Sequence, residues 1–194
     1  YEKAIKINPS HIDAHYNCGI ALKELGELQK AISSYEKAIK INPSHPDAYN
    51  NLGMVFQELG ERKKAISCYE KAIKINPSHT DSYWNMHSFA PNIDEALKIL
   101  KKLYNIDNKS FQTKVMISAL KYLKGDFNDF NTLIASPGSN HTLIRSIKWV
   151  FSLPQLPKIF FNRWSFFDAV TALTEKSRPF YEFGVWYGVS FQYL

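Results

Sequence analysis

The chain has 194 residues, of which 45% are hydrophobic, and it carries a net charge of +6. This length suits one or two domains, and its two cysteines, Cys18 and Cys68, are too few to indicate a disulfide framework or a zinc site. The basic residues form no stripe and the histidines do not cluster, so we expect neither nucleic-acid binding nor a bound metal.

The most informative feature is the segment YEKAIKINPSH, which occurs at Tyr1–His11, Tyr35–His45 and Tyr69–His79. Each copy begins 34 residues after the previous one. A fixed period of this size is typical of stacked helix–turn–helix repeats. The first copy has no helix before it, and we therefore expect the chain to be a fragment of a longer protein.

Each repeat unit is predicted to contain two helices. Helix A is expected at about 13–25 and 47–59, and helix B at about 28–41 and 62–75. Gly26 and Gly60 are expected to end helix A, because glycine adopts the left-handed conformation of a helix C-terminus without strain. Pro43 follows helix B, which a proline cannot continue. Ser44 and Asp47 offer side-chain oxygens where the next helix starts.

This pattern resembles the tetratricopeptide repeat. The residues that carry the resemblance are Gly19, Leu22, Gly26, Ala31, Tyr35, Ala38 and Pro43 in the first full unit, and Tyr49, Leu52, Gly53, Phe56, Gly60, Ala65, Tyr69, Ala72 and Pro77 in the second. His15 and Cys18 depart from the pattern, which usually has an aromatic residue and a leucine there. The resemblance implies an all-α solenoid of stacked helix pairs.

The period weakens after the second full unit. A third, degenerate unit begins at Thr80, contains Pro91 in a shortened turn, and extends the repeats to about residue 108. Residues 109–140 are predicted to form a further degenerate repeat or a helical cap, with a helix at about 111–123, a turn at 124–126 and a helix to about 135. Atypical terminal units of this kind often cap a repeat array.

Three asparagines, Asn17, Asn51 and Asn85, occupy equivalent positions on successive A helices. In tetratricopeptide arrays the A helices line the concave surface, and the type attached to glycosyltransferases carries a similar asparagine ladder. Amide side chains at a regular step can both donate to and accept from an extended peptide backbone. We therefore expect a protein or peptide partner to bind this face. The neighbouring residues expected to contribute are Tyr16, Asn50 and Trp84.

Composition changes after the repeats. Residues 141–178 are rich in aromatic residues and are predicted to form a helical connector. Its most apolar stretch, Trp149–Phe161, is interrupted by Pro154 and Pro157, so we expect no membrane span and infer a cytoplasmic location.

Residues 179–194 are predicted to contain a strand followed by a glycine loop. Phe180–Phe183 is short, apolar and β-prone, and Glu182, Gly184 and Gly188 follow the order of a nucleotide-binding loop. The stretch resembles motif I of class I S-adenosylmethionine-dependent methyltransferases, closest to the macrocin-O-methyltransferase type. The resemblance implies that Glu182, Gly184 and Gly188 contact S-adenosylmethionine and that a Rossmann-like α/β domain starts here.

Three functions fit the sequence. The chain is interpreted first as part of a repeat-containing methyltransferase, catalytically incomplete and expected to bind the cofactor poorly, because the other strands of such a sheet are missing. No catalytic residue can be assigned. The alternatives are a non-enzymatic scaffold for protein–protein interaction and a repeat array linked to a glycosyltransferase. The methyl acceptor and the repeat-bound partner are not determined by the sequence.

Overall fold

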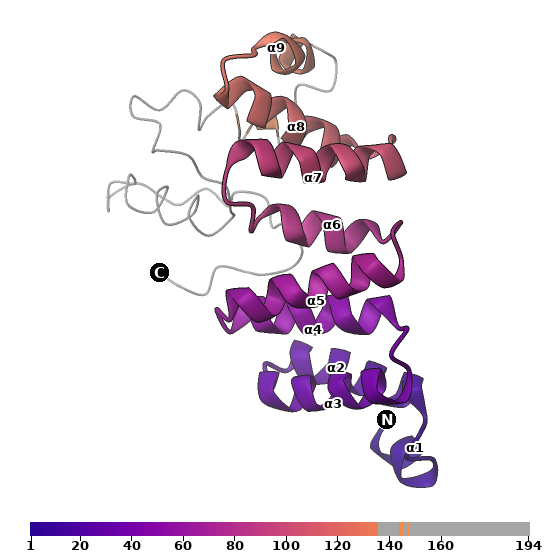
Figure 1. Cartoon of the computed structure of the whole chain (residues 1–194). Coiled ribbons are helices and arrows are strands. Elements are labelled where there is room, and N and C mark those ends of the chain that lie inside the picture. Colours follow the sequence, from indigo (N-terminus) through magenta and orange to yellow (C-terminus); the bar gives the residue numbers. More distant parts are fainter. Residues whose placement is uncertain (136–143, 146, 148–194) are drawn as a thin grey trace, which may run out of the picture. The chain divides into compact units, whose positions relative to one another are not determined.

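The computed structural model describes residues 1–135, 144, 145 and 147, which form helices joined by short loops and contain no strand. The chain divides into two compact units, Tyr1–Ala90 and Pro91–Leu194. Figure 1 shows the helices in chain order. Unit 1 contains α1 (Glu2–Ile7), α2 (Ile12–Glu24), α3 (Leu28–Ile41), α4 (Pro46–Glu58), α5 (Arg62–Ile75) and α6 (Thr80–His87), and the described part of unit 2 contains α7 (Ile93–Ile106), α8 (Phe111–Leu123) and α9 (Asn128–Ala135).

Unit 1 is built from successive helix pairs. Helix α2 packs on α3, α4 packs on α5, and α3 packs on α4 to join the two pairs. The A helices α2 and α4 begin and end one residue earlier than predicted, and the B helices α3 and α5 have the predicted bounds. Gly26 and Gly60 both have a φ of 74°, which confirms the predicted left-handed ends of the A helices. The helical solenoid predicted for this region is therefore confirmed.

The starts of the A helices differ from the prediction. Histidine, rather than Ser44 or Asp47, provides the N-cap: the Nδ1 atom of His45 accepts a hydrogen bond from the backbone N–H of Ala48 at 3.3 Å. The backbone N–H of Ser44 instead donates to Oδ1 of Asn42 at 3.0 Å. The loop thus turns the chain through Asn42 and leaves the imidazole of His45, not a hydroxyl, facing the free N–H groups of the helix.

The same loop geometry recurs in the other copies of the repeated segment. His11 accepts from Ala14, and His79 accepts from Ser82, each at 3.3 Å. The recurring histidines are therefore explained by helix capping.

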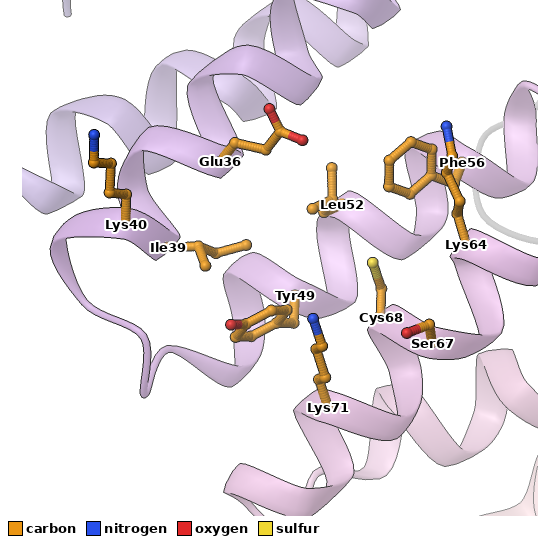
Figure 2. Close-up of a pocket in the computed structure, with 10 residues that line it drawn as sticks. All are labelled: Glu36, Ile39, Lys40, Tyr49, Leu52, Phe56, Lys64, Ser67, Cys68 and Lys71. Atoms are coloured by element: carbon orange, nitrogen blue, oxygen red, sulfur yellow. The ribbon is translucent and has the colours of Figure 1, made fainter.

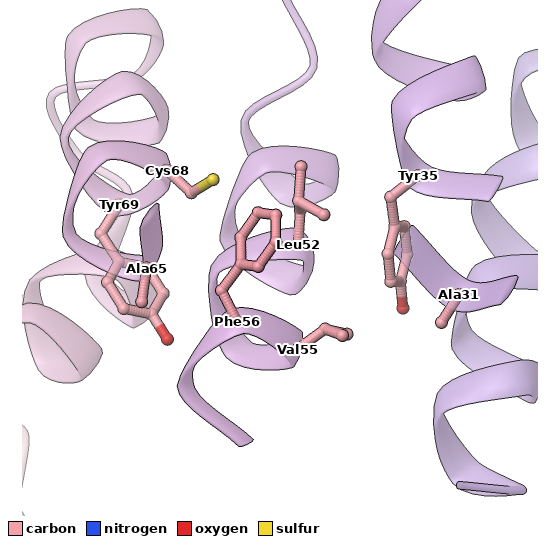
Figure 3. Close-up of a cluster of buried hydrophobic side chains, with 8 residues drawn as sticks. All are labelled: Ala31, Tyr35, Leu52, Val55, Phe56, Ala65, Cys68 and Tyr69. Atoms are coloured by element: carbon pink, nitrogen blue, oxygen red, sulfur yellow. The ribbon is translucent and has the colours of Figure 1, made fainter. Parts of the chain in front are cut away.

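A cluster of buried side chains joins α3, α4 and α5. Figure 3 shows this core, which consists of Ala31, Tyr35, Leu52, Val55, Phe56, Ala65, Cys68 and Tyr69. Tyr35 and Tyr69 are fully buried, and each ring lies against a glycine of the preceding A helix. A Cβ atom added to Gly19 would come within 2.6 Å of Cε1 of Tyr35, and one added to Gly53 within 2.7 Å of Cε1 of Tyr69. The small residues of the repeat therefore make room for its tyrosines.

The last helix of unit 1, α6, has 8 residues, whereas α2 and α4 have 13. The segment after it turns back onto the core: the Phe89 ring lies 6.1 Å from that of Tyr69, between ring centroids. The Arg62 guanidinium lies 5.1 Å from the centroid of the Phe89 ring and donates to the Phe89 carbonyl at 2.6 Å. Phe89 thus packs near the Tyr69 ring in the segment that follows the short helix α6.

The half-buried His87 at the end of α6 is expected to make the stability of unit 1 depend on pH. Burial lowers the pKa of the imidazole to about 4, although its hydrogen bond with the Trp84 carbonyl opposes this shift. The unfolded chain, with a histidine pKa of about 6.5, binds a proton that the folded chain does not. We therefore expect stability to be complete above pH 6.5 and to fall as the pH drops from about 6.5 towards 4, with a slope of up to about 1.4 kcal/mol per pH unit.

Urea unfolding at a series of pH values measures this slope, and His87→Gln provides the comparison. The difference in unfolding free energy between the two proteins should shrink as the pH falls through this window. A difference that is constant between pH 7 and 4 would contradict the proposed role of His87.

Unit 2 has its own core. Helix α8 packs against both α7 and α9, and α7 buries Leu97, Leu100 and Leu103 on one face. A separate cluster joins Val115 and Leu133 to Ile144. Helix α7 lies within the residues predicted as the third repeat, and it belongs to the compact unit that begins at Pro91. The third repeat itself stays a prediction. The helices predicted at 111–123 and up to about 135 are confirmed as α8 and α9.

The predicted strand and glycine loop at residues 179–194 lie outside the described residues, and so does the predicted connector at 141–178 apart from residues 144, 145 and 147. Among the described helices, none has both the length and the apolar character needed to cross a lipid bilayer.

Candidate peptide-binding site

The residues predicted to bind a peptide are adjacent pairs, one pair on each of the A helices α2, α4 and α6. Tyr16, Asn50 and Trp84 occupy the first position, and Asn17, Asn51 and Asn85 the second. We call this set the A-helix face. The structure brings several of its members together across the junctions between repeats.

At the first junction, Nδ2 of Asn51 donates to the hydroxyl of Tyr16 at 3.0 Å. The Tyr16 ring lies 4.9 Å from the ring of His45, between centroids. Burial raises the pKa of Tyr16, and the negative charge of Asp47 raises it further, whereas the hydrogen bond from Asn51 lowers it. The phenol therefore stays neutral near pH 7 and holds α2 to α4 as a hydrogen-bond acceptor.

At the second junction, asparagine takes the place of tyrosine. Oδ1 of Asn50 accepts from Nδ2 of Asn85 at 3.1 Å, and the hydroxyl of Ser82 lies 3.0 Å from the same oxygen. Asn50 is only 5% exposed. Nε2 of His79 lies 3.0 Å from Oδ1 of Asp47, which adds a second polar contact between these repeats.

These contacts divide the A-helix face into two groups. Asn50 is buried and its amide oxygen already has partners within the chain, so its role is to join the repeats. Asn17, Asn51 and Asn85 are half-buried. Asn51 and Asn85 each use one amide hydrogen in the junction bonds, and the amide group of Asn17 makes no hydrogen bond within the described residues. The second amide hydrogens and the oxygens of the three side chains leave capacity for a peptide backbone.

Trp84 lies at the C-terminal part of the same face. Its ring is half-buried and lies 4.8 Å from the ring of His87, between centroids. An aromatic side chain in this position offers apolar area next to the amide groups.

Two residues of the second junction, Ser82 and His79, were not identified from the sequence. The signal for Ser82 was present, because Ala14 and Ala48 occupy its position in the earlier units. A hydroxyl in place of a methyl group at a buried position indicates a hydrogen-bond partner, which here is Asn50. His79 carried no such signal, because the same histidine stands in every copy of the segment.

The two buried tyrosines of the core differ in one hydrogen bond. The Tyr69 hydroxyl donates to Oε1 of Gln57 at 2.9 Å, whereas the Tyr35 hydroxyl has no partner among the described residues. Lys23 stands in α2 where Gln57 stands in α4. Burial raises the pKa of Tyr35, and the nearby Asn51 amide opposes the rise without completing a hydrogen bond. Tyr35 is therefore a neutral donor that lacks an acceptor.

We expect Lys23→Gln to stabilise the chain by about 1 kcal/mol, because the glutamine oxygen gives the Tyr35 hydroxyl the acceptor that Tyr69 already has. Urea unfolding measures the change. Tyr35→Phe serves as the control. It should lower the free energy of unfolding more in the Lys23→Gln background than in the original chain. Equal costs in both backgrounds would show that the new hydrogen bond does not form.

In the described part of the chain, no group of three or more histidine, cysteine or carboxylate side chains could hold a metal ion. His15, which departs from the usual repeat pattern, is 5% exposed, and its Nε2 lies 2.9 Å from the Pro9 carbonyl. His15 thus joins α2 to the preceding loop.

Comparison with known proteins agrees with this architecture. Residues 1–26 and 21–60 match a family model described as "TPR repeat", and residues 46–79 match one described as "Tetratricopeptide repeat". Residues 1–79 of the chain are therefore tetratricopeptide repeats. No curated protein matches the sequence.

Several solved structures share the fold. A tetratricopeptide repeat protein from Parabacteroides merdae ATCC 43184 aligns with a TM-score of 0.65 and 20% identity, over 76% of this chain and 61% of its own. The crystal structure of MamA aligns with a TM-score of 0.58 and 22% identity, over 66% of this chain and 77% of its own. The first TPR of Spaghetti (RPAP3), bound to the HSP90 peptide SRMEEVD, aligns with a TM-score of 0.53 and 20% identity, over 59% of this chain and 93% of its own. At these identities the similarity establishes the fold alone.

Proposed function

We propose that the repeats form a scaffold for protein–protein interaction, in which the A-helix face binds an extended segment of a partner. The observation that carries the proposal is the row of half-buried asparagines at Asn17, Asn51 and Asn85, which have amide groups left over after the junction bonds are made. The first TPR of Spaghetti (RPAP3), which has been solved with a bound HSP90 peptide, supports peptide binding by this fold. Asn50 is assigned to the repeat junction rather than to the partner.

The proposal is tested with peptides selected from a displayed library of random 12-residue sequences. Selected peptides are labelled, and their affinities are measured by fluorescence anisotropy. Asn17→Ala removes a side chain that makes no hydrogen bond to the described residues, so its effect on folding should be small. We expect the variant with alanine at Asn17, Asn51 and Asn85 to bind at least about tenfold more weakly, because each lost hydrogen bond contributes about 1 kcal/mol.

Gln29→Ala is the matched control, since it removes an exposed amide from the B helix α3. Failure to select any peptide would contradict the proposal. So would equal affinities for the original chain and the triple variant. Circular dichroism of each variant separates lost binding from lost structure.

The methyltransferase interpretation of residues 179–194 stays a prediction from sequence. The matched family models end at residue 79 and do not bear on it, and Glu182, Gly184 and Gly188 lie outside the described residues. Calorimetric titration of this chain with S-adenosylmethionine tests the expectation that the cofactor binds poorly or not at all. Binding with a micromolar dissociation constant would overturn that expectation.

A further inference from the structure

A groove lies on the B-helix side of unit 1, between α3 and α5, with α4 as its floor. Its volume is about 360 Å³. Figure 2 shows the side chains around it. Those that define its chemistry are Lys40 on α3, Lys64 and Lys71 on α5, and the apolar residues Ile39, Tyr49 and Leu52. None of the asparagines of the A-helix face lines this groove, so it is a separate surface.

The groove occurs twice. A second hollow of about 280 Å³ is lined by Ile5, His15 and Lys37. These residues stand 34 positions before Ile39, Tyr49 and Lys71 of the first groove. The B-helix side therefore presents the same arrangement, a branched aliphatic residue, a ring and a lysine, in two successive repeats. A partner segment that fits one groove therefore meets a second, equivalent groove one repeat away.

The charge of the first groove is positive. Three lysines line it against a single carboxylate, that of Glu36. Lys64 forms an ion pair with Glu61 and lies 5.1 Å from the centroid of the Phe56 ring. Lys40 and Lys71 have no ion pair within the described residues, and Lys71 extends over the Tyr49 ring, with Nζ 5.6 Å from its centroid. Two ammonium groups at the rim are thus left for an external anion.

The apolar part of the groove lies between these charges. Ile39 and Tyr49 are half-buried, and Leu52 beneath them is 5% exposed. Cys68 is buried at the base, and burial raises the pKa of its thiol to about 11, so it adds no negative charge near pH 7. An occupant therefore meets an apolar floor flanked by cationic groups.

We propose that this groove binds an acidic segment of a partner protein, with aspartate or glutamate side chains at Lys40 and Lys71 and an apolar side chain on Ile39 and Tyr49. Charge complementarity selects the acidic chain and speeds its association. The repetition at Ile5, His15 and Lys37 allows one extended segment to occupy both grooves, which increases the overall affinity through effective concentration. This site is distinct from the A-helix face and does not depend on peptide binding there.

The test uses a labelled 12-residue peptide that carries glutamate at most positions and two phenylalanines. A second peptide has glutamine at each glutamate position. We expect the acidic peptide to bind and the glutamine peptide to bind at least about tenfold more weakly. Raising the salt concentration should weaken the binding of the acidic peptide, because exposed charges are screened.

Matched charge reversals locate the site. Lys71→Glu and Lys63→Glu both change an exposed lysine of α5, but only Lys71 lines the groove. We expect Lys71→Glu, and independently Lys40→Glu, to weaken the acidic peptide about tenfold, and Lys63→Glu to leave the affinity nearly unchanged. The alanine variants of the A-helix face should also leave it unchanged, so this proposal and the proposed function can fail separately.

Four outcomes would overturn the proposal. The first is no binding of the acidic peptide at about 1 mM, which is weaker than useful recognition. The second is equal weakening by Lys71→Glu and Lys63→Glu, which indicates attraction to the net charge of the chain. The third is a self-associated chain that Lys71→Glu dissociates in sedimentation, which makes the groove a contact between copies. The fourth is tighter binding of a short oligothymidylate with the same dependence on Lys71.

Discussion

Replacing Gly53 with alanine is expected to destabilise unit 1 by about 2 kcal/mol. The added Cβ would lie 2.7 Å from Cε1 and 3.0 Å from Cδ1 of Tyr69. Tyr69 is fully buried, so its ring cannot move aside without disturbing the core, and overpacking of this kind costs about 1–3 kcal/mol. The higher helix propensity of alanine, worth about 1 kcal/mol, offsets only part of the cost. Urea unfolding followed by circular dichroism measures the change.

Two comparisons test this explanation. Gly60→Ala places a methyl group where no atom lies within 4 Å, and it should cost about 1 kcal/mol through its left-handed backbone alone. The cost of Gly53→Ala should fall when Tyr69→Leu is already present, because the ring is then absent. If that cost is the same with tyrosine and with leucine, the proposed clash is wrong.

Leu100→Ala is expected to destabilise unit 2 by about 3 kcal/mol. Leu100 is fully buried on α7, and removal of a buried leucine side chain loses its transfer free energy and leaves a cavity. Amide hydrogen exchange provides the measurement, since the rates of residues 93–135 report on the helices of this unit. We expect faster exchange throughout α7 and α8, which pack on each other.

The neighbouring exposed residue supplies the control for Leu100. Lys101→Ala shortens a side chain on the same turn of α7 without opening a cavity, and it should change stability by less than about 0.5 kcal/mol. Unchanged exchange in Leu100→Ala would show that α7 does not contribute to a cooperative core.

The sequence predicted α2 to α5 to within one residue because the ends of the A helices depend on local chemistry. Gly26 and Gly60 end the A helices through their positive φ. This conformation is a property of glycine itself, so it can be predicted without knowing which residues pack nearby. The repeated segment recurs every 34 residues, so the helix bounds inferred for one unit also applied to the next. The same local reasoning located α8 and α9, where Gly125 has a φ of 90°.

Features that depend on contacts between repeats were harder to predict. The capping role of His45 was missed because hydroxyl and carboxylate side chains were expected in that position, whereas the turn through Asn42 aims the imidazole at the helix. Asn50 was placed with the peptide-binding residues because it neighbours the asparagine ladder on the same helix face. Its burial follows from Ser82 and Asn85 in the next repeat, which helix periodicity alone does not show.

The two B helices α3 and α5 share the segment YEKAIKI and the loop that follows it, and they adopt nearly the same geometry, with φ of −125° at Asn42 and −127° at Asn76. Nothing in that segment distinguishes one repeat from the next. The distinction comes from the A helices, where Tyr16 or Asn50 and Lys23 or Gln57 change the hydrogen bonds at equivalent positions. It also comes from the start of the B helices, where Arg62 of α5 replaces Leu28 of α3 and contacts Phe89. The order of the stack is therefore encoded outside the repeated segment, and exchanging Tyr35–His45 for Tyr69–His79 leaves the sequence identical.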